Sequence, residues 1–344
     1  RKGGISMKAI VVERPGVYGL REVEPPRIIR PDDVLVRVRA VGICGSDLHL
    51  LCGGNSAAQY PRIPGHEIVG EVQAIGDGVT GLAPGDRVIA EPLRYCGDCH
   101  ACRRGRRNVC QHLQIVSVHV DGGFAEYFVS PARNLFHLPD DIGWALATAI
   151  EPCTVGEQAH ARAGTLPGDT VLIHGAGPIG LMVLDTAKRL GARAIVSDPS
   201  ESRRRRAAAF GADAAIDPRT DDLRALVMQQ TGGVGANEIF DATDDVSLLP
   251  LSIELAATAG AIVPLSFSSD PVTVNFAPLN QKELTIAGTR HQYEMFPKVL
   301  AALPARMEML RRFVTHTFPL EQYEQAFALA GQREADACKI VLTV

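Results

Sequence analysis

Residues 174–180 read His-Gly-Ala-Gly-Pro-Ile-Gly, and this stretch decides the fold of the middle of the chain. It follows the apolar run Thr170–His174, which we expect to be a strand, and it opens a helical pattern over Pro178–Leu190. A G-x-G-x-x-G turn between a strand and a helix is typical of dinucleotide-binding folds. The sequence therefore predicts a nucleotide-binding turn here.

Each glycine of this turn has a separate expected role. Gly175 permits the tight turn, Gly177 lets the backbone approach a pyrophosphate, and Gly180 lets the helix pack closely on the sheet. The helix starts at Pro178, which has no N–H itself, and its first turn supplies free N–H groups from Ile179 onward and a positive dipole end for the phosphates. We expect all five residues to bind the cofactor.

Asp198 stands at the end of the next predicted strand and indicates which cofactor is used. A carboxylate there accepts the ribose hydroxyls of NAD and repels the 2′-phosphate of NADP. The arginine run 203–206 follows on the next helix. Arg203 lies on its first turn and is a candidate to contact the adenine or a 2′-phosphate. We therefore expect NAD rather than NADP, and keep NADP as the alternative.

Strands and helices alternate on both sides of this turn. Such alternation predicts a parallel, doubly wound sheet with helices on both faces. The expected strands are 170–174, 194–197, 214–216, 238–242, 261–267 and 284–287, and the expected helices are 144–163, 178–190, 200–210, 223–230 and 248–258.

The first part of the chain has a different pattern. Short apolar or alternating runs separated by Gly, Pro and Asp predict a β-rich domain there. The expected strands are 7–13, 33–42, 67–75, 86–91 and 124–130. The tail from Arg290 is expected to add two helical stretches and a final strand, 339–343.

Four cysteines stand close together, with spacings that suit one metal ion. Four thiolates in such a pattern can converge tetrahedrally on Zn²⁺ and leave no position for water, so we expect a structural zinc site. The residues are Cys96, Cys99, Cys102 and Cys110.

A second set of metal-ligand types is dispersed. Cys44, His66 and either Glu67 or Glu151 could hold a catalytic zinc with one open position. From these residues alone, both carboxylates remain candidates for the third ligand, and they could exchange during turnover. The sequence thus predicts two zinc ions per chain.

The chain resembles the zinc-containing medium-chain alcohol dehydrogenases from Met7 onward. The resemblance implies a GroES-like catalytic domain, 7–148 with 290–344, around a Rossmann NAD-binding domain, 149–289. The matching stretches are GICGSDLH (42–49), PGHEIVGEV (64–72), GDRV (85–88), CGDCHACRRGRRNVC (96–110), DGGFAEY (121–127), EP (151–152), GAGPIG (175–180) and GGVGANEIFDAT (232–243).

The resemblance also assigns residues to roles. It implies Cys44, His66 and Glu67 at the catalytic zinc, with Glu151 beside it. Ser46 and His49 match the positions of the proton relay in this family. Zinc is then expected to polarise a substrate hydroxyl while hydride leaves to the nicotinamide and the relay carries the proton to solvent.

The substrate class follows from a narrower similarity. Glu151-Pro152 is similar to the sorbitol, threonine and sugar-acid enzymes of the family, and VSVHVDGGFAEY (116–127) with Gly288-Thr-Arg290 to L-gulonate, L-galactonate or L-idonate 5-dehydrogenases. His119 and Arg290 are candidates to contact hydroxyls and a carboxylate. The alternatives are an NADP-dependent alcohol dehydrogenase or aldehyde reductase, which the arginine run 203–206 would suit, an enzyme like L-threonine 3-dehydrogenase, and a non-catalytic module that binds zinc and nucleotide.

Composition limits the possible partners. The 344 residues carry a formal net charge of −4, which gives no electrostatic reason to expect nucleic acid or an anionic membrane as partner. The first six residues lack the apolar core of a signal peptide, so we expect a start at Met7 and a cytoplasmic location. A sheet edge near Leu284 could pair with a second copy, so we expect a homodimer or homotetramer.

Overall fold

The computed structural model describes residues 6–332 and 336–344. The described chain divides into two compact units, Arg1–Glu151 with Phe296–Val344 (unit 1) and Pro152–Met295 (unit 2). These borders lie a few residues beyond the domain boundaries expected from the sequence. Residues 1–5, which precede the expected start, lie outside the described residues. No helix in the described part is both long enough and apolar enough to cross a membrane.

Unit 1 is rich in strands. Its main sheet runs in the order β16-β17-β3-β4-β5-β9, with β8 paired to β3, and two smaller sheets pair β1 with β2 and β6 with β7. The strands are β1 (Met7–Arg14), β2 (Val17–Val23), β3 (Asp33–Ile43), β4 (Glu67–Ile75), β5 (Arg87–Ala90), β6 (Leu93–Arg94), β7 (Gln114–Ile115), β8 (Tyr127–Pro131), β9 (Leu135–His137), β16 (Val314–Pro319) and β17 (Lys339–Thr343).

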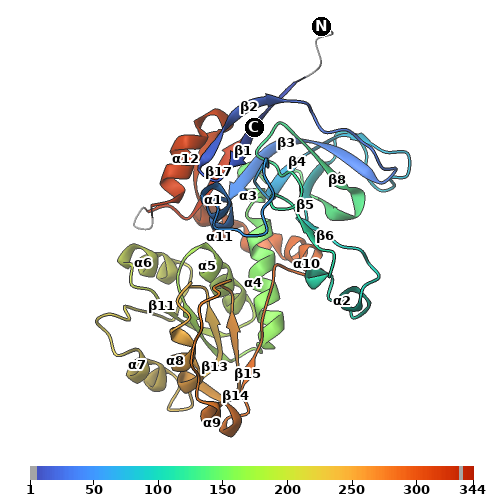
Figure 1. Ribbon diagram of the computed structural model, residues 1–344. Coiled ribbons are helices and arrows are strands. Elements are labelled where there is room, and N and C mark those ends of the chain that lie inside the picture. The colour runs from blue at the N-terminus through green and yellow to red at the C-terminus, as the bar shows by residue number, and fades with distance from the viewer. Residues whose placement is uncertain (1–5, 333–335) are drawn as a thin grey trace. The chain divides into compact units, whose positions relative to one another are not determined.

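Helices in unit 1 are mostly short. Figure 1 shows α12 and α1 close to the ribbons of β1 and β17. The α-helices are α1 (Gly45–Cys52), α2 (His100–Arg103), α3 (Trp144–Ala147), α10 (Met295–Ala301), which begins at the border, α11 (Leu303–Phe313) and α12 (Tyr323–Ala330), and the 3-10 helices are η1 (Arg107–Val109), η2 (Ala132–Asn134) and η3 (Leu320–Gln322).

The core of unit 1 joins segments that are far apart in sequence. Phe124 is fully buried, and its ring packs on that of Phe327, with centroids 5.6 Å apart. β17 pairs parallel with β16 and antiparallel with β3. The tail of the chain thereby completes the sheet that the first part begins.

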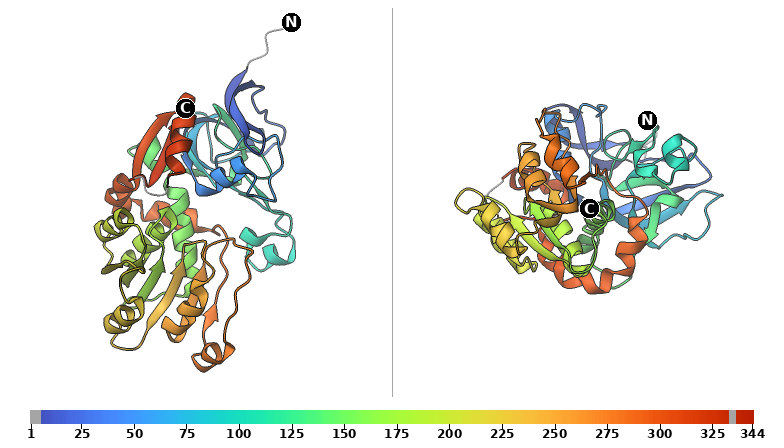
Figure 2. Two further views of the ribbon diagram at one scale, coloured as in Figure 1. Left: turned by 60° about the vertical axis from the view of Figure 1, so that its left-hand side comes forward. Right: turned by 90° about the horizontal axis from the view of Figure 1, so that it is seen from below.

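Unit 2, all of whose residues are described, holds a six-stranded parallel sheet in the order β12-β11-β10-β13-β14-β15. Helices flank this sheet in Figures 1 and 2. The strands are β10 (Thr170–His174), β11 (Arg193–Ser197), β12 (Ala214–Ile216), β13 (Ala236–Asp241), β14 (Ala256–Pro264) and β15 (Thr285–Ile286), and the helices are α4 (Ile150–Ala163), which starts at the border, α5 (Pro178–Arg189), α6 (Glu201–Ala209), α7 (Leu223–Gln230), α8 (Leu248–Leu255) and α9 (Phe276–Gln281).

This order is that of a Rossmann fold, with the first strand next to the fourth. The expected α/β class, with a strand-rich unit and a doubly wound unit, is confirmed. β10 is buried at every position, as befits a central parallel strand rich in Val, Leu and Ile. α5 takes Pro178 at its first turn and is followed by Gly191, whose φ of 81° suits only glycine well.

Some predicted elements differ from the structure. The helix expected over 248–258 ends at Leu255, and β14 begins at Ala256 without a loop between them. Alanine favours helices, so the local sequence predicts a longer helix, but the pairing of Ala256 with Ala236 on β13 overrides that preference. The helix expected over 144–163 is split into α3 and α4. The sequence analysis missed α1, β2 and β16 because each is short or has only weak alternation.

Candidate active site and metal centres

Three ligand types of unit 1 converge at one end of its sheet. Cys44 directly follows β3 and forms the N-cap of α1, His66 directly precedes β4, and Glu67 is the first residue of β4. One ligand atom from each lies within 4.8 Å of the others. Because β3 and β4 are antiparallel neighbours, the end of one strand meets the start of the other. The sheet therefore positions this trio.

Asp47 fixes the loop that carries Cys44. Its carboxylate accepts the N–H of Cys44 (2.9 Å) and the N–H of Gly65 (3.1 Å), and it lies 3.5 Å from His66 Nδ1. The first bond belongs to a capping box at the start of α1. Asp47 is buried, so these bonds hold the thiol and the imidazole in fixed positions.

Glu67 is placed by a glycine and a lysine. A Cβ on Gly42, its partner across the strands, would lie only 1.8 Å from Glu67 Oε2, so glycine is required there. Lys339 Nζ donates to Glu67 Oε1 at 2.6 Å and to the carbonyl of Ile43 at 3.1 Å. Glu67 Oε2 is buried and has no hydrogen-bond partner among the residues that the structure describes. One oxygen of this carboxylate is thus held and the other is left for a ligand.

The charges around the trio favour a cation. Burial alone would lower the pKa of His66, but the charge of Asp47 and the thiol of Cys44 raise it well above its ordinary value. Burial also opposes the charge on Lys339, yet Glu67 and Cys44 raise the pKa of that ammonium group. Several potential anions therefore surround few cations, and this donor set fits Zn²⁺.

Glu151 is not part of the trio of Cys44, His66 and Glu67, although the charges of His66 and Glu67 affect its pKa. It lies near the start of α4 and is buried, and burial raises its pKa to about 7, with the charge of Glu67 acting in the same direction. Among the described residues, the group with metal-ligand spacing contains Glu67 and not Glu151. The geometry thus favours Glu67 as the third ligand.

The four clustered cysteines also converge. Their Sγ atoms lie within 4.8 Å of one another, with Cys110 3.4 Å from Cys96 and 3.8 Å from Cys99. α2 and η1 bring them together. Backbone N–H groups of Cys102 and Gln111 lower the pKa of Cys99 to about 6, which favours the thiolate that a metal needs. Four sulfur donors with no open position fit a structural zinc ion.

The glycine turn of unit 2 has the shape that a dinucleotide requires. Gly175 adopts a φ of 89°, and a Cβ on Gly180 would lie 1.9 Å from the Gly175 carbonyl oxygen, so the fold itself demands both glycines. A Cβ on Gly177 would meet none of the described protein atoms within 4 Å. The fold therefore gives no reason for glycine at 177, whereas a pyrophosphate over the start of α5 would.

Asp198 directly follows β11 and is buried. Its Oδ2 accepts the N–H of Ala176 in the glycine turn, and its Oδ1 accepts the N–H of Ser200, each at 2.8 Å. Arg203 Nη1 lies 3.8 Å from Oδ2. The carboxylate is thus fixed beside the turn, where it can accept ribose hydroxyls, and Arg203 is close to it.

The remaining candidates are placed as follows. Ser46 and His49 lie exposed on α1, the helix that Cys44 caps. His119, half-buried in unit 1, accepts the N–H of Ile115 through Nδ1 at 3.0 Å and so stiffens its own loop. Arg290 is half-buried in unit 2. The two proposed substrate contacts thus belong to different units.

Both units match known families. Residues 30–140 match the alcohol dehydrogenase GroES-like domain, and residues 178–305 match the zinc-binding dehydrogenase family. The starvation-sensing protein RspB of Escherichia coli K12 is 36% identical over 339 residues, which cover 98% of this chain and 99% of RspB. The chain belongs to the zinc-containing medium-chain alcohol dehydrogenases. It is therefore a zinc-dependent alcohol dehydrogenase that uses NAD(P).

Other members of the family extend the comparison. L-threonine 3-dehydrogenase of Pyrococcus horikoshii is 39% identical over 334 residues, covering 94% of this chain and 95% of the relative. L-galactonate-5-dehydrogenase of Escherichia coli K12 is 33% identical over 328 residues, covering 93% and 95%.

Two solved structures that are similar to this chain hold nicotinamide cofactors. RspB of Escherichia coli CFT073, in complex with NADH, superimposes with a TM-score of 0.93 at 35% identity, covering 99% of this chain and 100% of that one. A zinc-binding dehydrogenase of Sinorhizobium meliloti 1021, bound to NADP, gives 0.92 at 28% identity, with the same coverage. The family thus includes structures with either nicotinamide cofactor.

Two residues of the alcohol dehydrogenase site escaped the sequence analysis. Asp47 stands in the motif GICGSDLH, three residues after Cys44, so a capping-box pattern could have revealed it. Lys339 is 272 residues from its partner Glu67. No local pattern connects them, because only the pairing of β17 with β3 brings them together.

Proposed function

We propose that this dehydrogenase oxidises a secondary hydroxyl of a small polyol or sugar acid, with NAD as hydride acceptor. The convergence of Cys44, His66 and Glu67 carries the proposal, because it leaves one coordination position for a substrate oxygen. Zinc bound by them would act as a Lewis acid on that oxygen. Gly175, Gly177, Pro178, Ile179 and Gly180 would hold the cofactor phosphates, with Asp198 and Arg203 at the adenosine ribose.

The substrate class is supported by the names of relatives. They are an L-galactonate-5-dehydrogenase and an L-threonine 3-dehydrogenase, named for reactions at carbon 5 and carbon 3 of small polar molecules. The 39% identity of the threonine enzyme makes L-threonine a second candidate. Reduction of NAD in the presence of L-threonine, neutral polyols and aldonic acids, measured by NADH absorbance, separates the two. Turnover of threonine alone would overturn the sugar-acid assignment.

The proposed catalytic zinc has a matched test on α1. Cys44→Ala should abolish NAD reduction and remove one zinc ion per chain, because it deletes a ligand. Cys52→Ala, at the exposed end of the same helix, should leave both quantities unchanged. Full activity in a zinc-free Cys44→Ala protein would contradict the proposal.

We also propose that Ser46 and His49 relay the hydroxyl proton to solvent. Ser46 would accept it and His49, which is exposed on the same helix, would release it to solvent. His49→Gln should slow turnover and move the pH optimum of the reaction upward. An unchanged pH–rate profile would contradict a relay through His49.

His119 and Arg290 are proposed to contact the substrate. A guanidinium grips a carboxylate with two hydrogen bonds, so Arg290→Ala should raise KM for aldonic acids far more than for neutral polyols. The neutral polyol is the matched control, because it lacks the carboxylate. Equal changes in KM for aldonic acids and for neutral polyols would show that Arg290 does not bind the substrate carboxylate.

We further propose a homodimer or homotetramer in a reducing compartment such as the cytoplasm. β15 is the edge strand of the parallel sheet, and both of its residues are exposed. An open edge can pair with a second copy. Light scattering after chromatography should give a multiple of 36.8 kDa, and Ile286→Lys should lower it. Zinc-binding thiolates also need reducing surroundings.

A further inference from the structure

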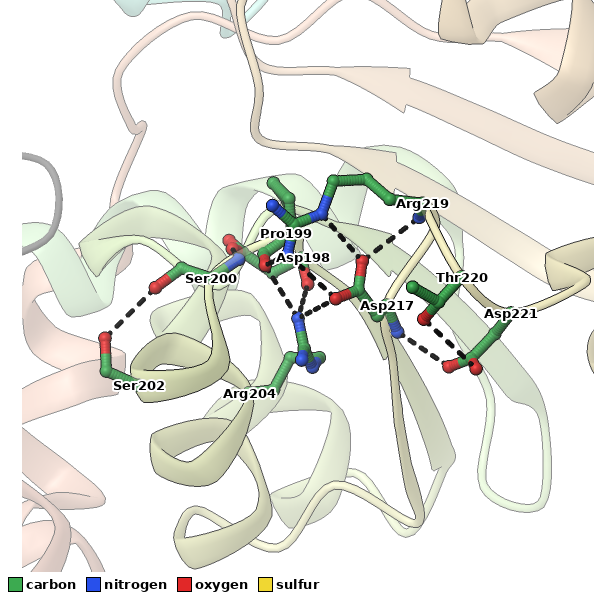
Figure 3. Close-up of polar contacts among 9 residues, drawn as sticks. All are labelled: Asp198, Pro199, Ser200, Ser202, Arg204, Asp217, Arg219, Thr220 and Asp221. Atoms are coloured by element: carbon green, nitrogen blue, oxygen red, sulfur yellow. Dashed lines mark hydrogen bonds and ion pairs between the residues drawn. The ribbon is translucent and has the colours of Figure 1, made fainter.

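Two arginines meet one aspartate next to the proposed ribose site (Figure 3). Asp198 and Asp217 directly follow the neighbouring parallel strands β11 and β12, so they lie at the same edge of the sheet. Arg204 Nη1 and Arg219 Nη2 each lie 2.9 Å from Asp217 Oδ2. Arg219 Nε donates to Asp217 Oδ1 at 3.0 Å. One carboxylate thus engages two guanidinium groups.

The same arginines are tied to the segment that carries Asp198. Arg204 Nη1 donates to the carbonyls of Asp198 and Pro199, at 2.8 Å each. Arg219 Nη2 donates to the carbonyl of Pro199. Both guanidinium groups therefore lie beside residues 198–199, and the charge of Asp198 contributes to raising the pKa of Arg219. The negative charge of Asp217 balances the positive charges of Arg204 and Arg219.

Asp217 is well suited to keep this charge balanced. Its side chain is only 10% exposed, and hydrogen bonds from Arg219 hold its pKa below the ordinary range of a carboxyl group. It therefore stays ionised at any pH at which the protein is used. NAD and NADP differ by one 2′-phosphate, and free guanidinium groups are strong phosphate ligands.

We propose that Asp217 is a positioning residue for cofactor selectivity: it occupies Arg204 and Arg219, which would otherwise form an anion site for the 2′-phosphate of NADP beside Asp198. This inference rests on the proposed use of NAD at the glycine turn. Asp217 would then be a second determinant of cofactor selectivity beside Asp198. It would act through Arg204 and Arg219 and would contact no cofactor atom itself.

The test is the ratio of dissociation constants, Kd for NADPH over Kd for NADH, from fluorescence titration of the zinc-loaded protein. Asp217→Asn and Asp217→Ser remove the charge but keep an acceptor for the N–H of Arg219, so the turn should survive. Either change should lower the ratio about tenfold, the size expected for gaining one charge-assisted hydrogen bond. Melting temperatures verify folding.

Asp221→Asn is the matched control. Asp221 lies on the same loop and accepts the N–H of Asp217, and no arginine contact to it occurs among the described residues. The Asp221→Asn change removes the same charge without freeing a guanidinium group, so the ratio of Kd for NADPH to Kd for NADH should not change. An equal fall in both variants would overturn the inference, because general loop charge would then explain the effect.

A second pair of measurements tests the route through the arginines. Adding Arg204→Gln and Arg219→Gln to Asp217→Asn should restore the wild-type ratio. The gain in NADPH affinity of Asp217→Asn should shrink as salt rises, since exposed charges are screened. A folded Asp217→Asn protein with the wild-type ratio at low salt would overturn the inference.

Failure of the proposed function has a different signature. A wild-type ratio below one would contradict the use of NAD, whereas a still lower ratio in Asp217→Asn would support the role of Asp217. A wild-type ratio well above one that does not change in Asp217→Asn would leave NAD use intact and overturn only the inference.

Discussion

Lys339 Nζ lies 2.6 Å from Glu67 Oε1, and both side chains are almost fully buried, at 3% and 1% exposure. A charge buried without a partner is costly, so each group depends on the other. The lysine engages one carboxylate oxygen, and within the described part of the chain Oε2 has no hydrogen-bond partner. This pair therefore connects the stability of unit 1 to its proposed metal site.

Lys339→Met should destabilise the protein, because it leaves the Glu67 carboxylate buried without its counter-ion. Breaking a buried pair by removing one partner costs about 3–5 kcal/mol, which corresponds to a fall in Tm of at least about 6 °C. Thermal unfolding with chelator and with added zinc measures it. The loss should be smaller with zinc, because a cation near Glu67 offsets its charge.

Lys8→Met is the matched control for Lys339→Met. Lys8 lies 2.7 Å from Glu321, but these side chains are 45% and 53% exposed. Exposed pairs contribute about 0–1 kcal/mol, so Tm should change little. Equal shifts in the two variants would show that burial of the Lys339 pair has no energetic consequence.

Two glycine substitutions should separate cofactor binding from folding. Gly177→Ala should fold with normal or slightly higher stability, because a Cβ there meets no protein atom, yet it should weaken NADH binding. Gly180→Ala should lower Tm, because its Cβ would lie 1.9 Å from the Gly175 carbonyl oxygen. Fluorescence titration and thermal unfolding measure the two effects. Normal NADH affinity in Gly177→Ala would contradict the assigned pyrophosphate position.

Cys102→Ala should reduce the zinc content from about two ions per chain to about one and lower Tm, because structural zinc contributes directly to folding. Elemental analysis and thermal unfolding provide the measurements. Cys52→Ala, an exposed thiol outside both clusters, should change neither. Unchanged zinc content in Cys102→Ala would refute the four-cysteine site.

His174 should make unit 2 less stable in acid. Burial lowers its pKa to about 4, whereas the unfolded chain keeps the ordinary value of 6.5. Between these values the unfolded state binds more protons, so stability falls as pH drops from about 6.5 to about 4, by about 3 kcal/mol in total.

Urea unfolding at several pH values tests this dependence. His174→Asn should flatten the change between pH 6.5 and 4, because asparagine does not titrate. His137→Asn should keep it, since the side chain of His137 is 59% exposed. The same pH slope in His174→Asn and in the wild type would rule out His174 as its source.

Features set by neighbouring residues were predictable from the sequence. The strand before Gly175, the helix after it and the Cys96–Cys110 cluster depend on spacings within a few turns of chain. The convergence of Cys44 with His66 was also expected, because the motifs GICGSDLH and PGHEIVGEV flank it. Such features can be predicted because the residue types that do the chemistry and the backbone structure that positions them are set by the same short segments.

Features set by distant pairing were not predictable. Nothing near Lys339 indicates Glu67, because β3 has to pair with both β17 and β4 to bring them together. Nothing near Arg204 indicates Arg219, because Arg204 lies on α6 after β11, Arg219 follows β12, and only the pairing of β11 with β12 brings them to Asp217. The choice of Glu67 over Glu151 required the register that places Gly42 opposite Glu67. A one-residue slip in that register would move Glu67 to the other face of the sheet.

β17 lies between β16 and β3 in the sheet of unit 1, and it carries Lys339. During synthesis the residues of unit 2 emerge before this strand does, so they can fold while the sheet of unit 1 still has a gap. Until the gap closes, Glu67 lacks its ammonium partner and Ile43 its pairing partner Ile340. A nascent chain that is halted before residue 339 should therefore be able to bind nicotinamide nucleotide but not yet zinc at Cys44.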